Sequence, residues 1–433
     1  MASSSKKQIK QQYITNIRYP YASSWDKTNT NVQFEFTNIN VSLVNGIRRV
    51  MLSSVNTLGF RTEDIIIIKN DTSLHNQIVS HRISMIPINE PNPKLFDIED
   101  YKFIINVSNN TNSIIQITSE NIEIKRISSN TMLSRNEVKK LFPPDPITGD
   151  YIWINNLKPK YFVPERNISS EVINEMSKTF NKLNVGEEVM NFHIEFKASI
   201  SNATENGHYN PCACASYINT VDPDKALIGL KTYIDTQNEN AKIKNTTIMT
   251  NEQLSKRFYT TEQARYFYTN DKEEANLFTF KIETVGIIPP LIIFHRSIDI
   301  IKDMIHSFIS NLISKNENKI IITPSKQLSG GYDIVVKDEN DTLGNIIQSH
   351  LCLLFSDLSL PAEQRKLTFI GYKKPHPLEN YIIFEIQGKT DNIDEIINDI
   401  IKIGCSEIVK MLNKIQNELE GTHQFINELK MIS

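Results

Sequence analysis

The residues best suited to chemistry in this sequence are a histidine, a glutamate and two cysteines. His193 and Glu195 are separated by one residue, and Pro211 is followed by Cys212 and Cys214. A histidine and two cysteines are zinc ligands, and a glutamate beside the metal can move protons to and from a zinc-bound water. The residue types therefore indicate one candidate reaction, hydrolysis by metal-activated water.

The spacing of these residues argues against that reaction. Zinc-dependent nucleobase deaminases carry His-x-Glu followed by Pro-Cys-x-x-Cys, whereas only one residue separates Cys212 from Cys214. His193 and Glu195 also alternate with the apolar residues of segment 192–196, which predicts a strand with these two side chains on its polar face. We expect structural roles for all four residues, and a zinc-dependent nucleobase-modifying enzyme stays as an alternative.

No other catalytic constellation accompanies the remaining candidates. His81, Arg82 and His376 have no serine or cysteine nucleophile, paired acid or glycine-rich phosphate loop beside them. A nucleotide-polymerising centre would need a carboxylate cluster for magnesium, of the Asp-x-Asp-x-Asp kind, and the sequence has none. We therefore expect a chain that is catalytically silent by itself.

Length and charge set broad limits on the function. With 433 residues the chain is long enough for several domains, and its net charge of -3 does not favour direct DNA binding. No apolar run is long enough to span a bilayer, the N-terminus does not read as a signal peptide, and four scattered cysteines do not make a disulfide framework. We expect a soluble, intracellular protein that contacts DNA only indirectly.

The elements that organise the chain are revealed by a motif that occurs twice. Residues 40–47 read NVSLVNGI and residues 340–347 read NDTLGNII, and both fit Asn-x-Ser/Thr-Leu-x-Asn-x-Ile. Upstream of each copy, apolar residues alternate over 32–36 and 332–336. Alternation predicts a strand, and the polar residues before each leucine can cap a helix start. Each copy therefore predicts a strand, a bend and a helix, and the two copies together predict an internal pseudo-dimer.

Composition and periodicity predict the remaining organisation. Residues 1–27 are polar and predict a flexible tail, whereas turn-rich strands predict a β-rich insertion over 96–269, with a loop and some helix over 236–268. Apolar residues spaced three and four apart predict helices over 298–313 and over 392–420, and the polar stretch 314–319 predicts a short linker.

The two motif regions resemble two different families. Residues 42–52 (SLVNGIRRVML), 81–87 (HRISMIP), 207–211 (GHYNP) and 278–286 (FTFKIETVG) are similar to the assembly-platform subunits of cellular RNA polymerases, namely bacterial α, archaeal D and the third-largest subunit of RNA polymerase II. Residues 341–345 (DTLGN) and 371–379 (GYKKPHPLE) resemble their small partner, archaeal subunit L or its eukaryotic counterpart.

The resemblance implies an α+β fold in which both partners of a heterodimer are fused. A large-half dimerisation module would comprise 28–95 with 270–315, a small-half module 318–433, and the inserted domain 96–269. The implied function is that of a non-catalytic platform that docks the two large polymerase subunits and small accessory ones, monomeric within the complex. Such fusions resemble those of large DNA viruses with AT-rich genomes, which would place the protein in the virion and in the viral factory of the host cytoplasm, or in the nucleus.

The resemblance also implies roles for individual residues. Arg48, Arg49 and Asn45 would dock a large subunit, since a guanidinium can form bidentate contacts. Relatives often hold zinc or an iron–sulfur cluster in the inserted domain, but residues 90–205 contain no cysteine, so we expect no metal or other cofactor. A scaffold unrelated to transcription stays as a further alternative. The residues expected to form the intramolecular dimer interface are Leu43, Ile47, Leu343, Ile347, Ile301, Ile305, Phe308, Ile400, Ile408 and Leu412.

Overall fold

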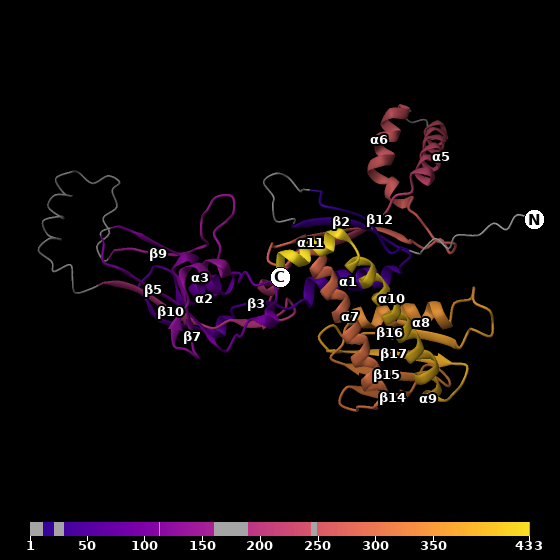
Figure 1. Ribbon diagram of the computed structural model, residues 1–433. Helices are drawn as coiled ribbons and strands as arrows, with labels where there is room; N and C mark the ends of the chain where they lie inside the picture. The colour runs from indigo at the N-terminus through magenta and orange to yellow at the C-terminus, as the bar shows by residue number, and fades with distance from the viewer. Residues whose placement is uncertain (1–11, 21–29, 112, 160–188, 244–248, 433) are drawn as a thin grey trace, which may run out of the picture. The chain divides into compact units, whose positions relative to one another are not determined.

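The computed structural model describes residues 12–20, 30–111, 113–159, 189–243 and 249–432 (Figure 1). The chain folds as two compact units, each of which has its own hydrophobic core. Unit 1 combines residues 1–55 with residues 212–433, and unit 2 is the continuous stretch 56–211. Both units mix helices with antiparallel strands, which confirms the predicted α+β fold.

The first half of unit 1 is built on a four-stranded antiparallel sheet. Its strands, in spatial order, are β1 (Ile14–Arg18), β2 (Asn31–Thr37), β13 (Leu277–Thr284) and β12 (Cys212–Asn219). Every second residue of β2 is buried because one face of the sheet packs against helices. Phe34 of β2 stacks on Phe280 of β13, and Phe294 of the following helix meets Phe34 edge-on with ring centroids 5.1 Å apart. These aromatic contacts fix the helix on the sheet.

The second half of unit 1 repeats this arrangement. Its sheet contains β14 (Ile320–Pro324), β15 (Tyr332–Lys337), β17 (Tyr381–Gly388) and β16 (Leu367–Lys373), in that spatial order. The neighbours β15-β17-β16 match the neighbours β2-β13-β12 of the first sheet. Helix α1 (Val41–Ser53) follows β2 as α8 (Asp341–Phe355) follows β15. The strand, bend and helix predicted for each motif copy are thus confirmed.

Helices from the two halves form one layer and one core. Helix α7 (Pro290–Ile313) and helix α10 (Lys402–Glu420) pack on each other, α7 packs on α1, and α10 packs on α8 (Figure 1). Helix α10 is preceded by α9 (Ile393–Ile396) and a π-helical turn (Ile397–Ile401), so the single helix predicted over 392–420 is divided near its start. Helix α11 (His423–Ile432) follows it and was not predicted.

Two stretches of unit 1 differ from the sequence prediction. The flexible tail predicted over 1–27 is wrong for residues 12–20, which contain β1 paired with β2, while the rest of that tail lies outside the described residues. Over 236–268 the chain is more helical than predicted, because α5 (Pro223–Ile243) and α6 (Asn251–Thr261) pair as a hairpin that projects from the sheet beside β12 (Figure 1). Thr250 and Gln253 start α6 with a reciprocal pair of side-chain caps.

Unit 2 is β-rich, as predicted for the insertion. Phe60, Phe103 and Phe196 pack together in its core, with ring centroids of Phe60 and Phe196 4.8 Å apart. The five-stranded sheet has the order β4 (Ile65–Asn70), β10 (Met190–Phe196), β5 (Tyr101–Asn109), β7 (Ile122–Arg126) and β8 (Thr131–Met132). Two-stranded pairs join β3 (Thr57–Gly59) to β11 (Ser199–Ser201) and β6 (Ile115–Thr118) to β9 (Trp153–Leu157). The α-helices among the described residues of this unit are α2 (Asn76–Ser84) and α3 (Arg135–Leu141).

The bounds of the inserted unit differ from the predicted 96–269 at both ends. Residues 56–95 belong to unit 2, because β4 pairs along its length with β10 and Phe60 lies in that core. Residues 212–269 belong to unit 1, because β12 pairs with β13. Strand pairing between distant segments, rather than local composition, therefore decides both boundaries.

Candidate dimerisation and docking site

The two motif helices begin in the same way. The Asn40 side-chain oxygen accepts a hydrogen bond from the amide of Ser42 at 2.7 Å, and the Asn340 oxygen accepts one from the amide of Thr342 at 2.8 Å. The first amides of a helix have no partner within the helix, so these two asparagines satisfy otherwise orphaned donors. The asparagine that opens the repeated motif is thus the N-cap residue in both copies.

Helices α1 and α8 cross at a glycine. A side-chain carbon built on Gly46 would lie 2.5 Å from Cδ1 of Ile346 and 3.0 Å from its Cγ1, well inside van der Waals contact. Glycine at this position therefore lets the two helices approach closely. Ile346 is the residue of the second copy that aligns with Gly46, so divergence between the copies has produced complementary shapes at the crossing.

The predicted docking residues lie on α1 beside this crossing. Arg49 is exposed, and its Nε donates to the Thr342 hydroxyl of α8 at 2.9 Å. Arg48 is half-buried, and its Nε donates to the Asn45 side-chain oxygen, one helical turn earlier, at 3.0 Å. The structure thus brings all three predicted docking residues to one helix face, with Arg49 also linking the two halves of unit 1.

The predicted interface residues lie in one cluster. Each is at most 4% exposed, and all belong to the core shared by the two halves of unit 1. They come from α1, α7, α8, the π-helical turn and α10, the elements that pack on one another across the two halves. The residues are Leu43, Ile47, Leu343, Ile347, Ile301, Ile305, Phe308, Ile400, Ile408 and Leu412.

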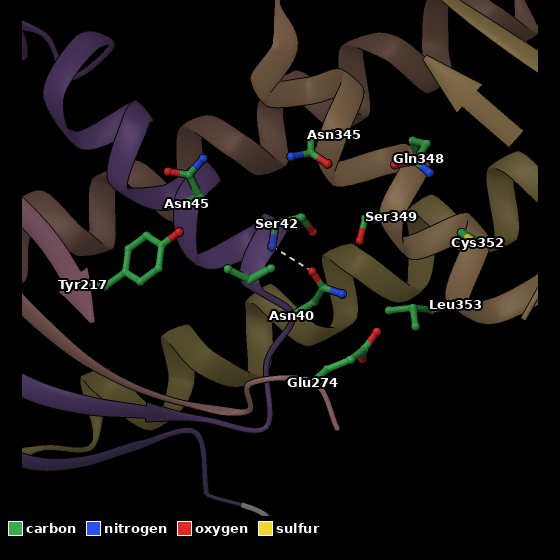
Figure 2. Close-up of a pocket in the computed structure, with 11 residues that line it drawn as sticks. Asn40, Ser42, Asn45, Tyr217, Glu274, Asn345, Gln348, Ser349, Cys352 and Leu353 are labelled. Atoms are coloured by element: carbon green, nitrogen blue, oxygen red, sulfur yellow. Dashed lines mark hydrogen bonds between the residues drawn. The ribbon is translucent and has the colours of Figure 1, made fainter. Parts of the chain in front are cut away.

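A polar cleft opens beside the start of α1. Its volume is about 360 Å³, and Figure 2 shows that residues of α1 and α8 face each other across it, among them Ser42, Asn345 and Ser349. Tyr217 of β12 and Glu274 of the loop before β13 complete the lining. The sequence motif indicated the helices but not the cleft, because the loop residues are far from the motif in sequence.

Two glutamates near the C-terminus accept hydrogen bonds from residues of the N-terminal segment 13–19. Glu418 of α10 accepts hydrogen bonds from the amides of Tyr13 and Ile14, at 2.9 Å and 3.0 Å, just where β1 begins. Glu428 of α11 is buried and accepts two hydrogen bonds, each 2.8 Å long. One comes from the Tyr19 hydroxyl, and the other comes from the backbone amide of Leu291 in the first turn of α7. Burial raises the pKa of Glu428 to about 7. Neither contact has a signal in the local sequence.

The residues considered for zinc chemistry occupy structural positions. His193 and Glu195 lie on the half-exposed face of β10, where Lys102 of β5 pairs with Glu195 at 2.6 Å. Cys212 is buried, and burial raises the pKa of its thiol to about 12, whereas Cys214 is exposed. Within the described ranges, no group of three or more His, Cys, Asp or Glu side chains is placed to hold a metal ion. A membrane-crossing helix is likewise not found among the described residues.

Comparison with known families identifies this fold. Residues 33–305 match the family described as the RNA polymerase Rpb3/Rpb11 dimerisation domain, and residues 332–418 match a second family with the same description. The chain therefore belongs to the Rpb3/Rpb11 dimerisation-domain family. The two matched regions divide between the two motif copies, so one chain carries two domains of this kind.

Individual relatives are similar to stretches of different length in this chain. A conjugation stage-specific protein of Tetrahymena thermophila is 20% identical over 323 residues, which are 66% of this chain and 92% of that protein. DNA-directed RNA polymerase subunit Rpo3 of Thermococcus kodakarensis is 29% identical over 80 residues, 18% of this chain and 30% of the subunit. The probable RNA polymerase II subunit RPB11 of Plasmodium berghei is 33% identical over 93 residues, 20% of this chain and 63% of that subunit. The chain thus spans less than two thirds of either polymerase subunit.

Proposed function

We propose that this chain is a non-catalytic assembly platform of a DNA-directed RNA polymerase, in which both partners of the platform heterodimer are fused. The observation that carries the proposal is the crossing of α1 and α8 within one core, since each helix belongs to a different dimerisation domain. A covalent link makes the pairing intramolecular, with an effective concentration on the order of millimolar for a short linker. The platform then forms without a second chain.

The first test of this proposal is the mass of the purified chain. If the two dimerisation domains pair within one polypeptide, light scattering gives a monomer over the whole accessible concentration range. A stable homodimer would contradict pairing within the chain, because the same helix faces would then be used between two copies. Absence of nucleotidyl transfer by the purified chain is expected in the same preparation.

We further propose that Arg48, Arg49 and Asn45 dock a large polymerase subunit. The support is their position on one face of α1, with Arg49 exposed. The test co-expresses the chain with the two largest polymerase subunits encoded by the same genome and measures co-purification. Arg48→Glu reverses a charge without touching the bond from Arg49 to Thr342, so a loss of co-purification reports docking rather than the helix crossing.

The matched control is another adjacent basic pair on an exposed helix face, Lys256 and Arg257 of α6. Reversal of these charges is expected to leave co-purification unchanged. Equal capture of the large subunits by Arg48→Glu, by Arg49→Glu and by the control would refute the docking role and favour a scaffold without this contact.

The proposed platform needs no metal and contacts DNA through its partners. The expectation of no metal rests on the sequence, in which residues 90–205 contain no cysteine and only one residue separates Cys212 from Cys214. Stoichiometric zinc in the purified chain, lost on Cys212→Ala, would contradict this and support a zinc-dependent enzyme. Tight DNA binding by the chain alone would contradict an indirect role for DNA.

A source in a large DNA virus is part of the same proposal, and it rests on the resemblance of the fusion to viral polymerase subunits. The protein would then act in the virion and in the cytoplasmic viral factory, with small accessory polymerase subunits as further partners. Detection of the chain by mass spectrometry in purified virions tests this origin, and a gene embedded in a cellular chromosome would contradict it.

A further inference from the structure

Two buried polar side chains beside the start of α1 have no partner. Among the described residues, Ser42 Oγ and His350 Nδ1 make no hydrogen bond, although the two residues are only 6% and 4% exposed. An unsatisfied buried polar atom costs on the order of 1–3 kcal/mol, so most such atoms in folded proteins are satisfied. An orphaned pair in one region indicates a place where another molecule supplies the missing partners.

Both orphaned side chains line cavities that adjoin each other. Ser42 lines the cleft of about 360 Å³ between α1 and α8, and His350 lines a second cavity of about 520 Å³. The two cavities share four lining residues, Asn40, Val41, Glu274 and Leu353. They therefore form one groove around the turn that leads into α1.

Carboxamide side chains are the most numerous kind in the lining of this groove, and we call it the carboxamide groove. Each carboxamide offers both a donor and an acceptor. The carboxamide residues that line it are Asn38, Asn40, Asn45, Asn219, Asn270, Asn276, Asn345 and Gln348.

The charged residues of the carboxamide groove do not favour a charged ligand. Lys272 pairs with Asp357, which lies just beyond the end of α8, and Glu274 accepts a hydrogen bond from Asn270 at 3.2 Å. Burial lowers the pKa of His350 to about 4, so its imidazole is neutral at pH 7. An anion would face Glu274 and a cation would face Lys272, whereas an apolar ligand would leave the orphaned atoms unsatisfied.

The ligand that fits is one with alternating, uncharged donors and acceptors. A peptide main chain has this pattern, because every peptide unit presents one N–H and one C=O. Carboxamide side chains, a serine hydroxyl and a neutral imidazole can satisfy such groups with hydrogen bonds of ordinary length. Recognition of an extended segment through its main chain is a recurrent mode of protein association.

We propose that the carboxamide groove binds an extended, uncharged segment of a partner polypeptide through its main chain. The proposal rests on the assembly function above, which makes the partner one of the two largest polymerase subunits. The groove adjoins the proposed docking residues, since Asn45 belongs to both. It adds a contact that depends on main-chain hydrogen bonds rather than on the charges of Arg48 and Arg49.

The first experiment locates the segment by photo-crosslinking. A benzophenone amino acid replaces Gln348, which lines the groove, in the full chain co-expressed with the two largest subunits. The expected result is a crosslink to one short segment without charged residues in one of those subunits. An assembled complex without a crosslink, or with a crosslink only to a charged segment or to a second copy of this chain, overturns the groove proposal alone. Failure of the complex to assemble counts against the platform function, and the groove proposal falls with it.

The second experiment separates a binding role from a structural one. Ser42→Ala removes a hydroxyl that has no partner in the free chain, so the unfolding temperature is expected to stay the same or rise, while association weakens about fivefold. The matched control is Ser297→Ala in α7, a buried serine whose hydroxyl donates to the Phe294 carbonyl at 2.6 Å. That control is expected to lower the unfolding temperature and leave association unchanged. Unchanged association in Ser42→Ala, or a loss of stability equal to the control, overturns the proposal.

Discussion

The glycine at the crossing of α1 and α8 allows a quantitative test of how the two halves pack. In Gly46→Val, the new side chain would begin 2.5 Å from Cδ1 of Ile346, whereas carbon atoms in contact lie about 3.5–4.0 Å apart. Overpacking of a buried site costs about 1–3 kcal/mol, and valine brings three carbons into this space. Replacing glycine by valine in a helix interior returns only about 0.3 kcal/mol, because the β-branched valine is itself a weaker helix former than alanine. We therefore expect a net loss of about 2 kcal/mol in the free energy of unfolding.

A second substitution, Ile346→Ala, is expected to relieve part of the crowding caused by Gly46→Val. Ile346→Ala alone creates a cavity and costs about 2–5 kcal/mol. In the double variant the valine occupies part of that cavity, so the combined loss is expected to fall short of the sum by about 1–3 kcal/mol. The free energy of unfolding is measured by urea unfolding, followed by circular dichroism, for the unchanged full chain, the two single variants and the double variant. Gly207→Ala is the control, because no heavy atom lies within 4 Å of its added carbon. Losses that add within about 0.5 kcal/mol would refute direct packing of Gly46 on Ile346.

Three further predictions concern other parts of unit 1. Because the folded-state pKa of Glu428, about 7, lies above its ordinary value of 4.5, the stability that its protonation contributes is complete below pH 4.5 and is lost as the pH rises through about 7. Glu428→Gln is therefore expected to remove this part of the pH dependence in urea titrations, and an unchanged pH profile would contradict it. A thiol reagent is expected to modify the exposed Cys214 rapidly. Cys405 is buried, and burial raises the pKa of its thiol to about 12, so it is expected to react only on unfolding. Equal reaction rates for the two thiols would be inconsistent with the burial of Cys405. Asn340→Ala is expected to cost about 1 kcal/mol through loss of the helix cap, whereas Asn340→Asp keeps an acceptor and costs less; equal losses in thermal unfolding would argue against the cap.

The parts of the fold that sequence could predict are those governed by local periodicity. Alternation of apolar residues predicted β2 and β15, and the polar residues before each motif leucine predicted that α1 and α8 begin there, although only the structure identifies Asn40 and Asn340 as the caps. The buried position of Leu43 and Leu343 follows from the same pattern, because spacing along a helix selects the face that packs.

The parts that could not be predicted depend on contacts between distant residues. β1 lies in a polar stretch, and the amide of Tyr13 meets a carboxylate 405 positions away in sequence. Helix α7 begins at Pro290 rather than near 298, since proline is tolerated in the first turn of a helix, where its missing amide hydrogen has no partner to lose. That Ser42 Oγ and His350 Nδ1 are buried without a hydrogen-bond partner follows from the packing of α8 beside α1, and periodicity in the sequence does not specify this packing.

The contacts between the two ends of the chain also determine the order in which its parts can fold during synthesis. Unit 2 is continuous, so it can fold as soon as its own residues have left the ribosome. By contrast, the hydrogen bond from Arg49 to Thr342 cannot form until a residue 293 positions later has been synthesised. The hydrogen bond from the start of β1 likewise requires Glu418. A nascent chain stalled before residue 332 should therefore protect unit 2 from protease while α1 is still cut, and protection of α1 at that stage would contradict this order. Until α7 and α8 have left the ribosome, the apolar face of α1 lacks the helices that cover it, so the nascent chain exposes an aggregation-prone surface during that interval.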